Sequence, residues 1–169
     1  MNFRIFRMTL VLALAGSANS QPLAAGKLLL ATAKSHDPDF TRSLVLLIHY
    51  DSESAIGLML NKPTTVPISE ILPEANGKSV TVYAGGPVSI GVRGLLRSKS
   101  PPFFSVVSNR LQILKLISGG APPSSFRIYA GYTGWTTQQL QSEVARGLWR
   151  VMPANPGILW PLLAPPQKR

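Results

Sequence analysis

Two glycine-rich segments, each placed directly after an apolar run, constrain the fold of this chain more than any other feature. Residues 85–87 (GGP) follow the apolar run 80–84, and residues 131–135 (GYTGW) follow the run 126–130. Glycine adopts backbone angles that other residues avoid, and it allows another segment to approach closely. We therefore expect each segment to form a turn that closes a strand.

The composition indicates one globular domain. The chain has 169 residues, of which 45% are hydrophobic and 14% are charged, far from the make-up of a disordered protein. A chain of this length buries most of its apolar surface in a single core. It has no cysteine, which excludes disulfides, thiol catalysis and cysteine-ligated metals. We expect the domain to span residues 21–165 and the tail 166–169 to be disordered.

The first twenty residues have the pattern of a secretory signal peptide. Two arginines precede the apolar stretch 8–15, and small residues at 18 and 20 are placed like a cleavage signal before Gln21. The stretch is too short for a membrane-spanning helix, which needs roughly 20 residues. We expect residues 1–20 to be removed, leaving a periplasmic or secreted chain with no transmembrane span. A wrongly assigned start codon, and hence a cytoplasmic protein, is the alternative.

The net charge of +10 favours anionic partners, whether nucleic acid, lipid headgroups or acidic polymers. The basic residues are scattered, however, and the nearest approach to a cluster is Arg93, Arg97 and Lys99, followed by Arg110 and Lys115. No helix-turn-helix pattern accompanies them. We interpret them as a solvated basic surface, with nonspecific phosphate binding as the alternative.

Apolar runs and turn residues predict a chain of short strands with few helices. Expected strands cover 27–33, 43–50, 55–61, 80–84, 92–97, 103–107, 126–130 and 149–152. The run 43–50 is too continuous for a half-exposed strand, so both of its faces are expected to be covered, and it forms an antiparallel hairpin with 55–61. A short helix is expected over 67–72.

Two longer helices have recognisable starts. Ser108 is the expected cap for a helix through Ile117, with Leu111, Leu114 and Ile117 on one side. Thr136, with Gln139 three residues later, has the form of a capping box for the next helix.

The chain carries no recognisable catalytic set, and we expect neither an enzyme nor a cofactor. His36, Asp37 and Asp39 lie in one loop, where an imidazole and two carboxylates suit a divalent metal or a proton shuttle. A further spaced ligand is missing, and aspartates beside proline serve as turn formers and caps. We expect no metal, with a hydrolase built on this loop kept as an alternative. The segment 85–91 lacks the spacing of a phosphate-binding loop.

The order and spacing of several motifs resemble the YqgE/AlgH family over most of the mature chain. The matching pieces are Asp37-Pro38, Phe40, Arg42-Ser43, Gly57-Leu58, Asn61-Lys62-Pro63-Thr64, residues 82–88, Arg93-Gly94, residues 131–135, Gln139-Leu140 and Glu143. The resemblance implies a single α/β domain of the α+β type, with a curved, largely antiparallel sheet packed by a few helices. It implies no established activity. The family name comes from a proposed role in transcriptional regulation of exopolysaccharide synthesis.

Three departures from the family pattern bear on function. His36 stands where an acidic residue is common, and the histidine usual soon after Arg93-Gly94 is absent. The apparent signal peptide would place this member outside the cytoplasm, where a transcription factor cannot act.

We therefore expect a noncatalytic binding or regulatory domain, exported in this case, whose partner is an unknown protein or an anionic ligand. A cytoplasmic regulator that binds nucleic acid or a regulatory protein is the alternative and requires that the chain is not exported. The candidate binding or structural residues are Asp37, Arg42, Asn61, Gly85, Gly86, Pro87, Arg93, Gly131 and Trp135. A groove between Gly86-Pro87 and Trp135 is the expected place for a site.

Overall fold

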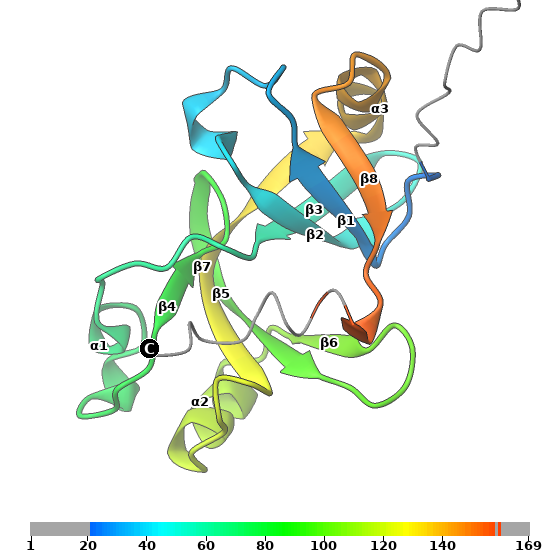
Figure 1. Ribbon diagram of the computed structural model, residues 1–169. Coiled ribbons are helices and arrows are strands. Elements are labelled where there is room, and N and C mark those ends of the chain that lie inside the picture. Colours follow the sequence, from blue (N-terminus) through cyan, green and yellow to red (C-terminus); the bar gives the residue numbers. More distant parts are fainter. Residues whose placement is uncertain (1–20, 158, 160–169) are drawn as a thin grey trace, which may run out of the picture.

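The computed structural model describes residues 21–157 and 159, which form one strongly curved, largely antiparallel sheet with helices packed on its outer faces (Figure 1). The expected α+β fold is confirmed. The predicted signal peptide, residues 1–20, and the predicted disordered tail, residues 166–169, lie outside the described residues. Within the described part of the chain, no helix is long and apolar enough to cross a membrane.

The sheet has eight strands, arranged in the order β6-β5-β7-β3-β2-β1-β8, with β4 pairing alongside β7. The strands are β1 (Lys27–Ala31), β2 (Leu44–Tyr50), β3 (Ser54–Met59), β4 (Val82–Ala84), β5 (Val88–Arg97), β6 (Phe104–Val107), β7 (Phe126–Thr136) and β8 (Trp149–Pro153). All named pairs are antiparallel except β4 with β7. The predicted hairpin of β2 and β3 is confirmed.

Strand β7 connects the two halves of the sheet. Residues 126–132 pair with β5 and β4, whereas residues 133–136 pair with β3. The expectation that residues 131–135 form a turn is therefore wrong, because the strand continues through them. Gly131 has a φ of +71°, which bends the strand without ending it.

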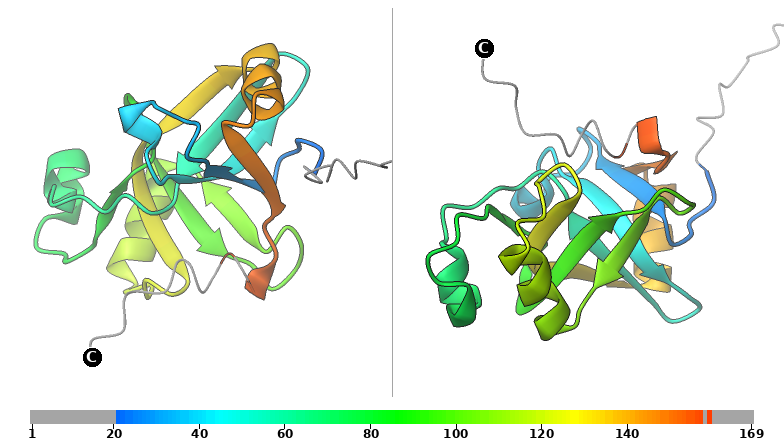
Figure 2. Two further views of the ribbon diagram at one scale, coloured as in Figure 1. Left: turned by 45° about the horizontal axis from the view of Figure 1, so that its top comes forward. Right: turned by 90° about the horizontal axis from the view of Figure 1, so that it is seen from below.

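Three helices cover the outer faces of the sheet. They are α1 (Ile68–Ile71), α2 (Arg110–Ser118) and α3 (Thr137–Ala145). Two 3-10 turns, η1 (Pro38–Phe40) and η2 (Pro73–Ala75), accompany them, and residues 156, 157 and 159 are also helical. Figure 2 shows from two further directions that α1 and α2 lie near each other, while α3 lies at the far end of the molecule.

Apolar side chains form three clusters that explain this layering. The inner faces of both sheet halves meet in one cluster, which includes Leu46 on β2 and Leu95 on β5. A second cluster lies between β1, β2, β3, β8 and α3, and it contains Val45. A third lies beneath α1 and α2. Because Val45 and Leu46 alternate between two clusters, both faces of β2 are covered at this point, as its continuous apolar run predicts.

Helix α2 differs in detail from its prediction. Its cap is Asn109, whose side-chain oxygen accepts from the Gln112 amide at 3.0 Å, so the choice of Ser108 is wrong by one residue. Leu111 is 68% exposed, and the buried residues of the helix are Ile113 and Ile117. Of the three residues expected on one side, Ile117 is buried and Leu114 packs against the third cluster, so the expectation is wrong for Leu111.

The start of α3 confirms half of its predicted capping box. Thr136 accepts a hydrogen bond from the Gln139 amide at 3.1 Å. The Gln139 side chain donates forward to Glu143 at 3.0 Å, one helical turn later.

The two glycine segments touch each other. A side-chain carbon added to Gly85 would lie 2.3 Å from the carbonyl oxygen of Gly131, and one added to Gly86 would lie 2.2 Å from the backbone of Tyr132. One added to Gly131 would lie 2.4 Å from the carbonyl oxygen of Val88. These glycines are therefore required by a close crossing of two backbones.

Candidate functional site

A surface groove of about 370 Å³ lies beside α3, where the loop after β1 approaches β7 and β8. We call it the aromatic groove, and its lining residues are Lys34, Ser35, His36, Asp37, Phe40, Pro87, Gly134, Trp135, Gln139, Glu143, Arg146, Leu148 and Trp149. Pro87 and Trp135, which were expected to flank a site, both line it.

Three aromatic rings form one wall of the groove. Phe40 stacks on Trp135 with ring centroids 5.9 Å apart and meets Trp149 edge to face at 5.3 Å. The two indoles are nearly perpendicular, with centroids 5.9 Å apart. Trp135 and Trp149 are only 6% and 3% exposed, so most of each ring belongs to the core. Such edge and stacked contacts hold the rings in fixed positions.

Glu143 links the two indoles. Trp135 Nε1 and Trp149 Nε1 both donate to Glu143 Oε2, at 3.1 and 2.8 Å, and Gln139 donates to Oε1 at 3.0 Å. A carboxylate that accepts hydrogen bonds from three N–H groups holds those groups in place. Glu143 thereby joins α3, β7 and β8 beneath the groove.

Exposed charged groups surround the aromatic wall. Lys34, His36 and Arg146 are exposed basic or titratable groups from the loop after β1 and the end of α3. Asp37 is also exposed, and its Oδ1 accepts from the Asp39 amide at 2.9 Å, which caps η1. The rim therefore has more cationic than anionic side chains.

Arg42 and Asn61 act together in the backbone architecture. Asn61 donates from Nδ2 to the carbonyl oxygen of Arg42 at 2.8 Å and accepts from the Leu44 amide at 3.0 Å. Arg42 has a φ of +56°, a conformation that is uncommon for a residue with a side chain. The asparagine therefore ties the entry of β2 to the end of β3.

Arg93 lies on β5, outside the lining of the aromatic groove. Its guanidinium lies 4.5 Å from the centre of the Tyr132 ring. The ion pairs of the described residues are Arg110 with Glu74 and His49 with Asp51. Arg93 is thus held by an aromatic ring rather than by a carboxylate.

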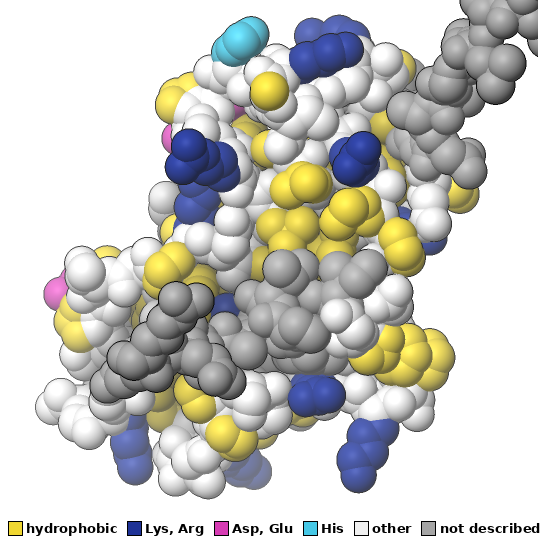
Figure 3. Space-filling view, viewed as in Figure 1, with side chains coloured by type: hydrophobic (Ala, Val, Ile, Leu, Met, Phe, Trp, Pro, Cys, Tyr) yellow, Lys and Arg dark blue, Asp and Glu magenta, His cyan; other side chains and the backbone are white. Residues whose placement is uncertain are grey.

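The surface charge is dispersed. In Figure 3, Lys and Arg side chains are distributed over the visible face and do not gather into one patch. The described residues contain no group of three His, Cys, Asp or Glu side chains that could hold a metal ion.

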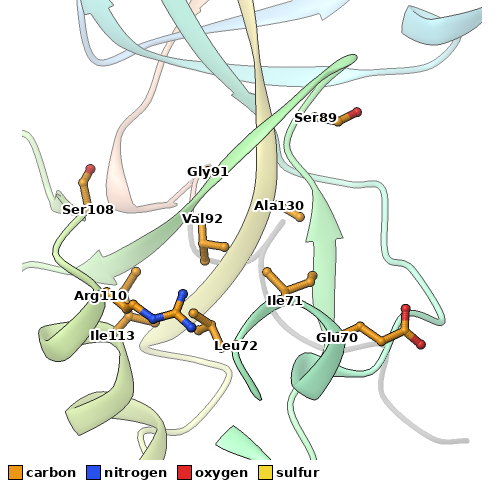
Figure 4. A pocket seen from close by; sticks show the side chains of 10 residues that line it. All are labelled: Glu70, Ile71, Leu72, Ser89, Gly91, Val92, Ser108, Arg110, Ile113 and Ala130. Atoms are coloured by element: carbon orange, nitrogen blue, oxygen red, sulfur yellow. The ribbon is translucent and has the colours of Figure 1, made fainter. Parts of the chain in front are cut away.

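A second cavity, of about 430 Å³, lies between α1, α2 and β5 (Figure 4). Apolar side chains such as Ile71 and Val92 project toward it in this view. Arg110 also lines the cavity, and its Nε donates to Glu74 at 3.0 Å. This hydrogen bond lowers the pKa of Glu74. The positive charge of Arg110 is therefore already paired within the fold.

The sequence interpretation did not place Glu143, Trp149 or Phe40 in a site. One local signal was available, because Gln139 and Glu143 are four residues apart and share one face of α3. Nothing local indicated that Trp149 would meet the same carboxylate, since its strand joins the groove only through the sheet.

Comparison with known proteins agrees with the fold. A sequence profile described as AlgH-like matches residues 28–168. A UPF0301 protein of Streptomyces avermitilis is 37% identical, with 78% of this chain and 76% of that protein covered. The UPF0301 protein AlgH of Pseudomonas aeruginosa is 29% identical, with coverage of 83% and 82%. The solution structure of an AlgH protein from that species has a TM-score of 0.65 at 25% identity and covers 80% of each chain.

Proposed function

This chain belongs to the AlgH-like family, and on that premise we propose that it is a noncatalytic domain that binds a partner protein through the aromatic groove. The observation that carries the proposal is the fixed wall formed by Phe40, Trp135 and Trp149 beside an exposed cationic rim. Phe40 is the half-buried ring of this wall and is held in place by the two buried indoles, and a fixed aromatic group with polar neighbours favours protein recognition.

The chemistry of the groove favours binding over catalysis. Glu143 accepts from two indoles and one amide, which occupies the carboxylate in holding the wall. Lys34, His36 and Arg146 lie on the rim and are exposed. The partner segment that fits this arrangement has an apolar anchor for the wall and an acidic side chain for the rim.

The proposal includes export. Its support is the N-terminal pattern of two arginines, an apolar stretch at 8–15 and small residues before Gln21. N-terminal sequencing of the protein recovered from fractionated cells tests this part. A chain that starts at Gln21 in the extracytoplasmic fraction is expected. An intact N-terminus in the cytoplasm would contradict export and would favour the alternative, a regulator that binds nucleic acid or a regulatory protein.

Site-specific crosslinking tests the groove. A photoreactive residue at position 36 should give a discrete adduct in cells, and Arg146→Glu should abolish it by reversing the rim charge. The matched control places the same residue at position 115, an exposed lysine on α2. Identical adducts from both positions, or an adduct that survives Arg146→Glu, would contradict binding at the groove.

Gel mobility of DNA and RNA tests the alternative directly. Scattered basic residues favour weak, salt-dependent contacts with phosphates. On the leading proposal, mobility at low salt stays unchanged at micromolar protein. A retarded band that depends on Arg97 and Lys99 would instead favour the regulator.

A further inference from the structure

A third cavity, of about 410 Å³, lies between β4, the start of β7 and the end of α2. We call it the Arg127 cavity, and it is lined by Lys78, Ser79, Val80, Thr81, Tyr83, Ile117, Ser118, Gly120, Ala121, Pro122, Pro123, Phe126 and Arg127. It shares no lining residue with the aromatic groove.

Arg127 is a buried cation that pairs with no carboxylate among the described residues. Arg127 is only 5% exposed, and its Nε has no hydrogen-bond partner. The guanidinium lies 4.5 Å from the centre of the Tyr83 ring. The ion pairs of the described residues do not include it, and no acidic residue lines the cavity. Because arginine keeps its proton in proteins, this charge cannot be removed by neutralisation.

A second unsatisfied donor lies beside this cation. Tyr129 is fully buried, and its hydroxyl has no hydrogen-bond partner. Its ring lies 5.6 Å from that of Tyr83, and Arg127 is close enough to influence its titration. Burial raises the pKa of Tyr129, so its phenol stays neutral and keeps its proton at physiological pH. A buried polar group without a partner costs free energy, and the Arg127 guanidinium partly offsets the effect of burial on the pKa of Tyr129 by favouring its ionised form.

The rest of the cavity has two kinds of surface. Ile117, Phe126 and the prolines after α2 provide an apolar wall. Lys78 is exposed and adds a second positive charge to the lining. Pockets of a few hundred cubic ångströms with an apolar lining and a few directed polar groups are typical of small-molecule sites.

We propose that the Arg127 cavity binds a small anionic amphiphile, whose carboxylate or phosphate group pairs with Arg127 and whose apolar body lies against Ile117 and Phe126. Such an anion supplies the partner that the buried guanidinium lacks, and guanidinium binds oxyanions strongly through paired N–H donors. The site is independent of the partner binding proposed for the aromatic groove.

Calorimetric titration with four matched probes tests the chemistry. Sodium octanoate and octyl phosphate carry the anionic group, whereas 1-octanol and octylammonium share the chain without it. Saturable binding is expected for at least one of the anions, and which of the two binds assigns the head group. Inorganic phosphate and acetate, which lack the apolar body, should bind at least about tenfold more weakly than the corresponding amphiphile.

The variants locate the site. Arg127→Gln should weaken binding of the anion by roughly tenfold to a hundredfold, as expected for the loss of a hydrogen bond to a charged group. Lys78→Gln should weaken it by a smaller factor because Lys78 is exposed. The control Lys115→Gln removes an exposed charge from α2, the helix that carries Ile117, outside the lining of the cavity, and should leave the affinity unchanged.

A measurement on the unaltered chain keeps the proposal testable if Arg127→Gln does not fold. The side-chain Nε–Hε resonance of Arg127 should shift with octanoate or octyl phosphate and stay in place with 1-octanol. Equal binding of octylammonium and the anions would overturn the proposal. So would an Arg127 resonance that does not respond, or an affinity that Arg127→Gln leaves unchanged.

Discussion

Gly85 lies so close to Gly131 that a side-chain carbon on Gly85 would be 2.3 Å from the carbonyl oxygen of Gly131. The amide of Gly85 itself donates to Ala130 at 2.7 Å. Backbone crosses backbone at this point, so the loop after β4 depends on the bend in β7. The two glycine segments are thus parts of one structural joint.

Gly85→Ala should destabilise the fold by roughly 3 kcal/mol, at the upper end of the range for overpacked interiors, because the obstructing atoms belong to the backbone. Urea denaturation measures the effect. Gly134→Ala is the matched control on the same strand, since its nearest neighbour is the Tyr132 ring at an ordinary 3.4 Å. Equal urea midpoints for Gly85→Ala and Gly134→Ala would contradict the close approach of the Gly85 and Gly131 backbones.

Asn61→Ala should lower the free energy of unfolding by about 1 to 3 kcal/mol. The variant removes both side-chain bonds that Asn61 makes, one to the carbonyl oxygen of Arg42 and one to the Leu44 amide. Thermal denaturation measures the loss. Asn76→Ala, at an exposed position in η2's cap, should change the melting temperature little. A comparable loss in both variants would remove the special role of Asn61.

Glu143→Ala should destabilise the protein by roughly 2 to 3 kcal/mol, because two indole N–H groups lose a charged acceptor in a largely buried setting. Tryptophan fluorescence should also change, since the environment of Trp135 and Trp149 changes. The control Glu70→Ala removes an exposed carboxylate on α1. An emission spectrum that stays the same in Glu143→Ala would contradict the shared acceptor.

Asp51 should make stability depend on acid pH. The Ser54 amide, then the Glu53 amide and His49, hold the pKa of this carboxyl below its usual value. A lowered folded-state pKa means that the ionised group stabilises the fold above the unfolded pKa of about 3.9, and that this contribution is lost as pH falls through the folded value. The free energy of unfolding should therefore fall more steeply between pH 6 and pH 2 for the unaltered chain than for Asp51→Asn. Parallel curves would refute the assignment.

Ser108 and Asn109 are neighbours, but Asn109 is the cap of α2. Asn109→Ala should cost about 1 kcal/mol, because Asn109 accepts from the Gln112 amide. Ser108→Ala should cost little, although the local sequence favours serine as the cap. Chemical denaturation of both variants decides between them, and a larger loss in Ser108→Ala would restore the original prediction.

Local patterns located most of the strands correctly because burial leaves a direct trace in the sequence. The continuous apolar run of β2 reflects two covered faces, and Thr136 begins α3 as its spacing to Gln139 predicts. The segment 131–135 was wrong for a physical reason. A glycine permits either a turn or a bend, and the pairing of residues 133–136 with β3 decided in favour of the bend.

The candidate site was less accessible to sequence reasoning. Pro87 and Trp135 were expected beside a groove, and both line one. Their neighbours Glu143 and Trp149 come from α3 and β8, whose meeting depends on the sheet. Arg127 stands inside an apolar strand pattern, which predicts the strand but does not say whether the arginine is buried.

The sequence alone determined the family resemblance, the hairpin of β2 and β3 and the start of α3, since these depend on residues close together in the chain. Only the tertiary structure decided that Glu143 accepts from two indoles and that Arg127 is buried with no ion pair to any described carboxylate. Hydrogen bonding and desolvation depend on distances in space, and those distances exist only once β7 has joined both halves of the sheet.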